Sequence, residues 1–327
     1  MIKYFWIIIG IVFIGQYLSG SGSAEELGQL LQTHFAIYNR NQGELELLDG
    51  SNTADIDGVL LRTAEKRNAI RQAVQDNVRF ENPSAQTVPL LAEHYGKTEQ
   101  AAAKRSLQRE RIDQSVEALQ SLFQFSQQLC DAGQYDCRLT AAKLRLQGIP
   151  LVQDVLLHPK TRHTHYVGVY EMLRVQLDRW TKDKDIWTEY KTECLRVYAL
   201  TDTPQQDKPF FEKAVNVMIE SCSLPYYKRQ PVLRQLKEQV RSGTPAISKD
   251  LLKVIPDAME QLALERTQCE MLYLGLGIAL RKEQRVVHTQ PPLVPLTGET
   301  YSIKLITGGI MITYPGNVKA CYVPYRK

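Results

Sequence analysis

Residues 98–130 read TEQAAAKRSLQRERIDQSVEALQSLFQFSQQLC, and this stretch decides the fold class. Its apolar residues recur three or four positions apart, while Lys104, Arg109 and Asp113 fall on the opposite side of a helical projection. The spacing predicts one long helix from about Thr98 to Leu129 whose apolar stripe packs against a core. The stripe comprises Leu107, Ile112, Val116, Leu119, Phe123, Ser126 and Cys130.

Helical spacing also dominates the chain on both sides of this stretch. The last long helix is expected to open at Ser248 or Lys249, with Pro256 kinking or restarting it, and Gly275 and Gly277 permit a neighbour to approach closely. We therefore predict a mostly α fold, a helical array with antiparallel hairpins of helices.

The period changes after Pro291-Pro292. Apolar residues then alternate, and Thr307-Gly308-Gly309 supplies a short turn between two alternating runs. This pattern predicts a small C-terminal β-hairpin, with a third strand within residues 318–323. The alternating residues are Tyr301, Ile303 and Leu305, then Ile310, Ile312 and Tyr314.

The charge of the chain is mild and mixed. The 327 residues include 40 basic and 36 acidic side chains, a formal net charge of +4, and the two signs are interspersed. Nucleic-acid binding needs a concentrated basic stripe that neutralises phosphates. We therefore expect no nucleic-acid partner.

The N-terminus has the order of an export leader. Lys3 precedes the mostly apolar run Tyr4 to Leu18, and small residues follow from Ser19 to Ala24. Residues 1–24 are therefore read either as a signal peptide cleaved after Ala24 or as an uncleaved N-terminal membrane anchor. Both readings place the body outside the cytosol, periplasmic or anchored to the inner membrane.

We accordingly divide the chain into three parts. Residues 1–24 form the leader, residues 25–285 form a helical body, and residues 286–327 form the β-hairpin packed on the last long helix.

An even number of cysteines is compatible with complete pairing in an oxidising compartment. The simplest scheme joins neighbours along the chain, so that the first bridge closes a helical hairpin; some of the six are alternatively small buried side chains. The disulfide candidates are Cys130 with Cys137, Cys194 with Cys222, and Cys269 with Cys321.

The C-terminal fifth resembles the ending of a group of uncharacterised bacterial membrane-anchored proteins and, more distantly, that of the major pseudopilins of type II secretion. The matching pieces are residues 258–280, 295–301 and 308–316. The resemblance implies a helix followed by a hairpin and transfers no activity. The chain departs from the pseudopilins because its leader lacks the glutamate that follows their processing site, and because a large helical body separates leader and hairpin.

Three of the six histidines, His158, His163 and His165, fall within eight residues of an expected loop. On an extended segment, His163 and His165 would point the same way, as zinc ligands do. The alternative is a solvated loop whose histidines bind nothing. Neither a Gly-bounded nucleophile nor a phosphate-binding glycine loop is present in the sequence.

A second candidate site is the cluster Tyr226-Tyr227-Lys228-Arg229, which follows Pro225. Exposed tyrosines beside cations suit contacts with saccharides, lipid headgroups or proteins, so Tyr226, Tyr227 and Arg229 are candidates for a ligand rim. Alternatively, the rings cap the adjacent helices.

These patterns favour a non-enzymatic envelope protein that binds other envelope proteins or the cell wall, without a cofactor. If the leader stays uncleaved, residues 4–18 also contact the inner membrane. The alternative is a metal-dependent hydrolase of the periplasm that uses zinc at the loop from His158 to His165. A third class, a lipid carrier, requires an internal apolar cavity between the helices.

Overall fold

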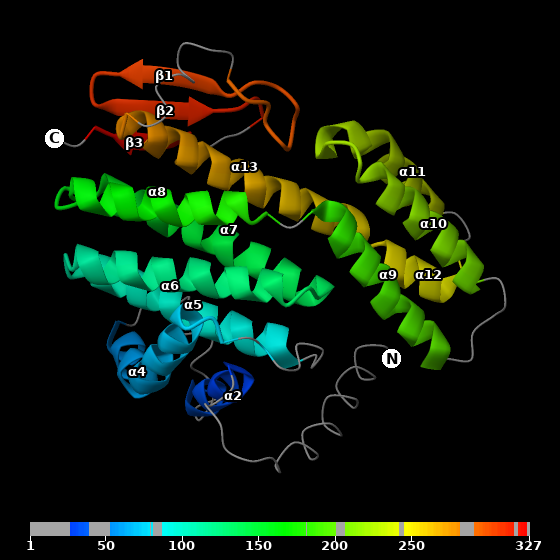
Figure 1. Ribbon diagram of the computed structural model, residues 1–327, viewed down its shortest axis with the longest axis horizontal. Coiled ribbons are helices and arrows are strands. Elements are labelled where there is room, and N and C mark those ends of the chain that lie inside the picture. The colour runs from blue at the N-terminus through cyan, green and yellow to red at the C-terminus, as the bar shows by residue number, and fades with distance from the viewer. Residues whose placement is uncertain are drawn as a thin grey trace. The chain divides into compact units, whose positions relative to one another are not determined.

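The protein is described by a computed structural model that covers residues 27–38, 53–78, 80, 87–180, 182–200, 207–241, 245–281, 291–316 and 320–325. The leader, residues 1–24, and the expected boundary at residue 285 lie outside the described residues. The mostly α prediction is confirmed, because helices dominate and a small antiparallel sheet ends the chain (Figure 1). Within the described residues, no helix combines the length and apolarity that crossing a membrane requires.

The chain forms two compact units, Met1–Ala102 and Ala103–Lys327. Unit 1 contains α2 (Leu27–Tyr38), α4 (Thr53–Gln75) and the first part of α5 (Thr87–Gln108). Leu27, Leu31 and Ile70 are buried in it, as is His34, whose ring lies edge-on to Tyr95. The apolar positions of these helices thus form a small core with polar groups inside.

The predicted helix from Thr98 to Leu129 is broken in the structure. Helix α5 ends at Gln108, and α6 runs over Ile112–Asp131. Glu110 adopts a left-handed φ of 59°, and the Arg111 N–H returns to the Ser106 carbonyl over 2.9 Å, so this turn satisfies carbonyls at the end of α5. No glycine or proline marks the turn, which is why the periodicity alone missed it.

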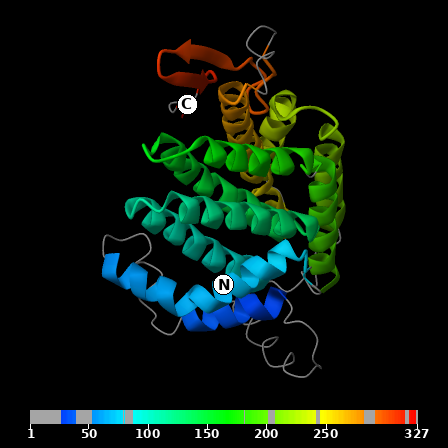
Figure 2. The same cartoon turned by 60° about the vertical axis from the view of Figure 1, so that its left-hand side comes forward.

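Unit 2 is built around a helical hairpin and two further long helices. Helix α6 turns at Ala132–Gln134 into α7 (Tyr135–Leu157), as predicted, and α8 (His163–Asp178) and α13 (Ile255–Ala279) pack beside them (Figures 1 and 2). Pro256 lies in the first turn of α13, where a missing N–H costs no hydrogen bond, so it restarts the helix.

A second group of helices packs around Trp187, which is fully buried. Their apolar positions share one core cluster with the end of α7 that carries Tyr135. The group consists of α9 (Asp183–Leu200), α10 (Asp207–Ser221), the short 3₁₀ helix η2 (Tyr226–Arg229), α11 (Gln230–Arg241) and α12 (Ala246–Leu252).

The C-terminal sheet has the order β1-β2-β3 and is antiparallel throughout. Strand β1 (Ser302–Ile306) pairs with β2 (Gly309–Thr313), whose other edge pairs with β3 (Cys321–Pro324). A methyl group at Gly275 of α13 would lie 2.8 Å from Val323 Cγ2 of β3, so the predicted close approach at this glycine is confirmed. The sheet thereby rests directly on α13.

The six cysteines are all free thiols, so the predicted disulfide bonds are not supported. Two of the thiols lie beside polar groups: Cys130 Sγ lies 2.8 Å from the Arg145 guanidinium, and Cys222 Sγ lies 3.4 Å from the Met218 carbonyl. Burial raises the pKa of the thiols of Cys137, Cys194, Cys269 and Cys321, each to about 12. They act as small buried side chains, the alternative that the sequence left open.

Candidate functional site

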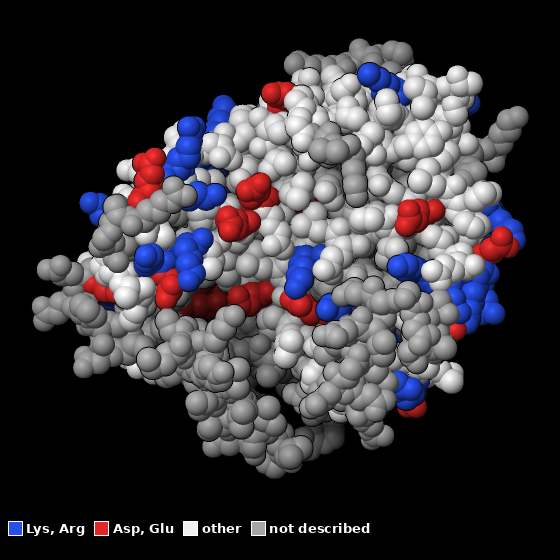
Figure 3. Space-filling model, turned by 180° about the vertical axis from the view of Figure 1, so that it is seen from behind, with Lys and Arg blue, Asp and Glu red and all other residues white. Residues whose placement is uncertain are grey.

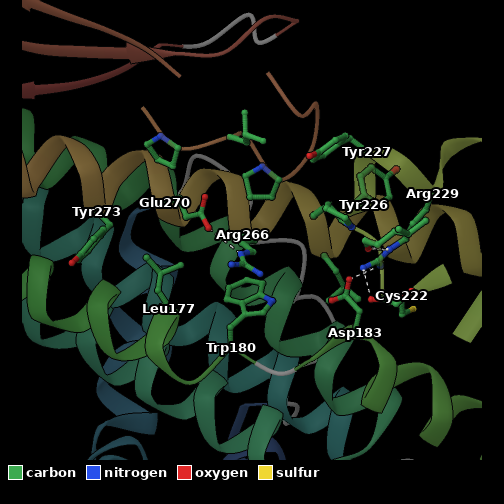
Figure 4. Close-up of a pocket in the computed structure, with 18 of the residues that line it drawn as sticks. Leu177, Trp180, Asp183, Cys222, Tyr226, Tyr227, Arg229, Arg266, Glu270 and Tyr273 are labelled. Carbon is green, nitrogen blue, oxygen red and sulfur yellow. Dashed lines mark hydrogen bonds and ion pairs between the residues drawn. The ribbon is translucent and has the colours of Figure 1, made fainter. Parts of the chain in front are cut away.

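A pocket of about 700 Å³ opens on unit 2 where four separate segments meet (Figure 4). The end of α8 supplies Leu177 and the residues just after it supply Trp180. Helix α13 supplies Arg266 and Glu270, and the segment before β1 adds the proline-bounded edge at residues 292–295. The fourth segment, residues 222–229, carries the candidate rim. Pockets of 300–1,000 Å³ are typical ligand sites.

All three predicted rim residues line this pocket, but the Arg229 guanidinium is already hydrogen-bonded within the protein. Its guanidinium donates to the Leu224 carbonyl over 2.7 Å and to the Cys222 carbonyl over 3.3 Å, and it pairs with Asp183 over 2.5 Å. The side chain is buried as a result. Arg229 therefore fixes the shape of the loop. Tyr226 is buried in the core cluster of the neighbouring helices, and Tyr227 is partly exposed.

Tyr227 is held against the opposite edge of the pocket by a glycine. Gly298 has a φ of +76°, and a methyl group there would lie 2.4 Å from Tyr227 Cδ2. The ring thus rests on bare backbone, which a side chain would block. This contact joins the 222–229 loop to the segment that leads into β1.

The pocket floor carries a paired arginine and glutamate on α13. Arg266 Nε donates to Glu270 Oε1 over 2.9 Å, and the Tyr301 hydroxyl donates to Glu270 Oε2 over 3.2 Å. Burial raises the pKa of Glu270, and the two hydrogen bonds oppose that rise. Both carboxylate oxygens therefore have a donor, whereas Arg266 stays half exposed.

Three arginines surround the ring of Trp180. The guanidinium carbons of Arg138, Arg145 and Arg266 lie 4.9, 5.6 and 5.7 Å from the ring centroid. The first two are buried below the floor, where they share Glu265: Arg145 Nε is 2.7 Å and Arg138 Nη1 is 3.1 Å from its carboxylate oxygens. Such stacking holds the tryptophan and the arginines in fixed orientations.

The candidate metal histidines are not gathered by the fold. His158 follows α7 and its Nδ1 accepts the Lys160 N–H over 3.2 Å, while His165 Nε2 lies 2.7 Å from Asp113 Oδ1. His163 and His165 stand in the first turn of α8, where side chains two residues apart project in nearly opposite directions. The expected extended segment is therefore a helix start.

No group of three or more His, Cys, Asp or Glu side chains is arranged to hold a metal ion in the part of the chain that the structure describes. On the face seen in Figure 3, Lys and Arg side chains lie among Asp and Glu side chains. The pocket lined by Trp180 and Arg266 combines a cavity with aromatic and charged groups.

Comparison with known proteins found no protein family, curated protein or solved structure that matches the chain. The resemblance of the C-terminal fifth to bacterial membrane-anchored proteins stays a prediction.

Sequence reasoning found the tyrosines of the pocket but missed its centre. Trp180 follows the end of α8, whereas Arg266 and Glu270 lie in the middle of α13, where a charged residue looks like an ordinary solvated position. A signal was present in Glu265-Arg266, a charged pair within the apolar stripe of the last helix, because buried charges require partners.

Proposed function

We propose that the chain is a non-enzymatic binding protein of the bacterial envelope, exported or anchored by residues 1–24, and that the pocket of unit 2 holds an extended segment of a partner protein. The observation that carries this proposal is the composition of the pocket. It places Trp180, Tyr226, Tyr227, Tyr273 and Arg266 around one cavity, and tryptophan, tyrosine and arginine are the residues that dominate binding energy at protein interfaces.

The edge of the pocket supports a protein ligand over an enclosed small molecule. Leu224 and Leu293 line the pocket and remain 43% and 49% exposed, with Pro225, Pro292 and Pro295 beside them. Exposed apolar side chains around a charged floor offer area that a partner chain can cover. A volume of about 700 Å³ accommodates a few residues of an extended peptide.

The chemistry of the pocket favours binding over catalysis. Burial raises the pKa of the Cys222 thiol, which lines the pocket, to about 11, so it is protonated at neutral pH and a poor nucleophile. Asp183 is held by Arg229, and Glu270 by Arg266 and Tyr301. These carboxylates therefore act as fixed partners within the protein.

The test uses a library of hexapeptides with acetylated and amidated ends, screened by fluorescence anisotropy against the full chain and two variants. Leu293→Arg places a charged side chain at the pocket edge. Leu305→Arg makes the same change on β1, outside the pocket, at a leucine that is 54% exposed. Both substitutions keep an exposed position exposed, so neither is expected to disturb folding.

We expect peptides that bind the wild type to lose at least tenfold in affinity with Leu293→Arg and to keep their affinity with Leu305→Arg. A library without binders, or binders that both variants affect equally, would overturn the proposal. Export is tested separately with alkaline phosphatase fused to the C-terminus of the full chain, because this enzyme is active only outside the cytosol; an inactive fusion would refute the envelope location.

A further inference from the structure

Arg266 has unused hydrogen-bonding capacity at the centre of the pocket. Its side chain is 48% exposed, and within the described residues its hydrogen bond to Glu270 is made by Nε. Arg266 lines the cavity, and its guanidinium lies over Trp180 (Figure 4). A guanidinium presents its two terminal amino groups as a planar fork that matches the two oxygens of a carboxylate.

The orientation of this fork is fixed in advance. The Glu270 carboxylate holds Nε from one side, and the indole ring of Trp180 lies 5.7 Å from the guanidinium carbon. Glu270 is itself held by the Tyr301 hydroxyl, whose oxygen also lies 3.3 Å from the Thr267 carbonyl. Because the Arg266 side chain is already held in place, binding a ligand costs it little conformational entropy, which favours affinity.

The charge balance around Trp180 favours an anion. Arg138, Arg145 and Arg266 contribute three positive charges, whereas Glu265 and Glu270 contribute two negative charges. The remaining charged pair that lines the pocket, Asp183 with Arg229, is neutral as a whole. The five side chains thus carry one net positive charge, and among the three arginines Arg266 is the half-exposed one.

We infer that the partner segment binds with an acidic side chain, whose carboxylate accepts hydrogen bonds from both terminal amino groups of Arg266. This inference rests on the proposed function and names the residue class that the pocket selects. The same cavity is lined by Tyr227, Leu293 and the prolines, so apolar residues are expected beside the acidic one in the partner segment. Arg266 determines specificity, and Tyr227 and Leu293 contribute contact area.

The test compares members of the hexapeptide library that differ only in carrying a carboxylate or an amide on one side chain. Peptides with Asp or Glu at one position are measured against peptides with Asn or Gln there, and because both ends are blocked, the side chain is the source of any carboxylate. We expect the acidic peptides to bind about tenfold or more tightly to the wild type, as a charge-assisted bidentate pair requires.

Two arginine variants test whether Arg266 causes the preference for acidic peptides. Arg266→Gln is expected to abolish the difference between acidic and amide peptides. The control is Arg174→Gln, which changes an arginine of α8 that is 47% exposed and pairs with Glu171 and Asp178 away from the pocket; it should leave the preference unchanged.

The outcomes separate the two proposals. If peptides bind in a Leu293-dependent way but amide and acidic members bind equally, or if Arg266→Gln keeps the acidic preference, the inference about the carboxylate is wrong and the proposed function stands. If no peptide depends on Leu293, the proposed function fails, and the inference that rests on it fails as well.

Discussion

Replacing Glu265 by glutamine removes a buried charge that two arginines share. Glu265 is completely buried, and its oxygens lie 2.7 Å from Arg145 Nε and 3.1 Å from Arg138 Nη1, both side chains being almost inaccessible. Removing one member of a buried ion pair costs about 3–5 kcal/mol, because the partner charge stays buried without compensation. We expect Glu265→Gln to lower the free energy of unfolding of unit 2 by about 4 kcal/mol.

The control makes the same substitution in a pair of similar length at the surface. Glu171 lies 2.7 Å from Arg174 Nε, with side chains 40% and 47% exposed. Exposed pairs contribute about 0–1 kcal/mol, so Glu171→Gln should change stability by no more than about 0.5 kcal/mol. The two variants make the same substitution in ion pairs of the same length, and the pairs differ in burial.

Urea unfolding followed by tryptophan fluorescence measures the difference, since Trp180 and Trp187 both lie in unit 2. With a slope of about 2–3 kcal/mol per molar urea, Glu265→Gln should lower the transition midpoint by roughly 1–2 M. Equal midpoints for the two variants would refute the reasoning, because they would mean that water reaches the arginines and replaces the carboxylate.

Three further predictions follow from other parts of the chain. Burial lowers the pKa of His34 from 6.5 to about 4, so between these pH values a proton binds His34 in the unfolded chain and not in the folded one. The free energy of unfolding should therefore be highest above about pH 6.5 and fall by roughly 3 kcal/mol towards pH 4. Urea unfolding followed by circular dichroism should show a weaker pH dependence of stability for His34→Gln than for the control His163→Gln, and an equal dependence would contradict the assignment to His34. Gly298→Ala should cost about 1–2 kcal/mol, because alanine disfavours a φ of +76° and meets the Tyr227 ring; an unchanged melting temperature would disprove the contact. Alkylation in denaturant without a reductant, followed by intact mass, should add six labels to the chain, and no labels would establish three disulfides.

The fold class was predictable because helix and strand periods are local properties of the sequence. Alternation in Ile310 and Ile312 predicted the buried face of β2, and Gly275 indicated a close contact before its partner was known. These features depend on neighbours in the chain, which a single sequence displays directly.

The break after Gln108 and the centre of the pocket depend on contacts that the sequence does not display. Glu110 takes a left-handed conformation without the glycine that usually signals it. The pairing of Arg145 on α7 with Glu265 on α13 joins residues far apart in the chain, and no local pattern identifies such a partner. The extended segment expected at His163 and His165 was wrong for the opposite reason, since a short local motif was read without knowing that a helix begins at His163.

Helix α13 has few positions that face solvent. From Met271 to Ile278 every residue except Tyr273 is buried, and the preceding turns supply Glu265 and the floor of the pocket. Helix α11, by contrast, buries Leu233 and Leu236 and exposes most of its other side chains. In a library that varies every position, α13 should accept few alternatives and α11 many. The two helices will therefore diverge at different rates among descendants of this chain, and α13 will remain the segment by which a distant relative can be recognised.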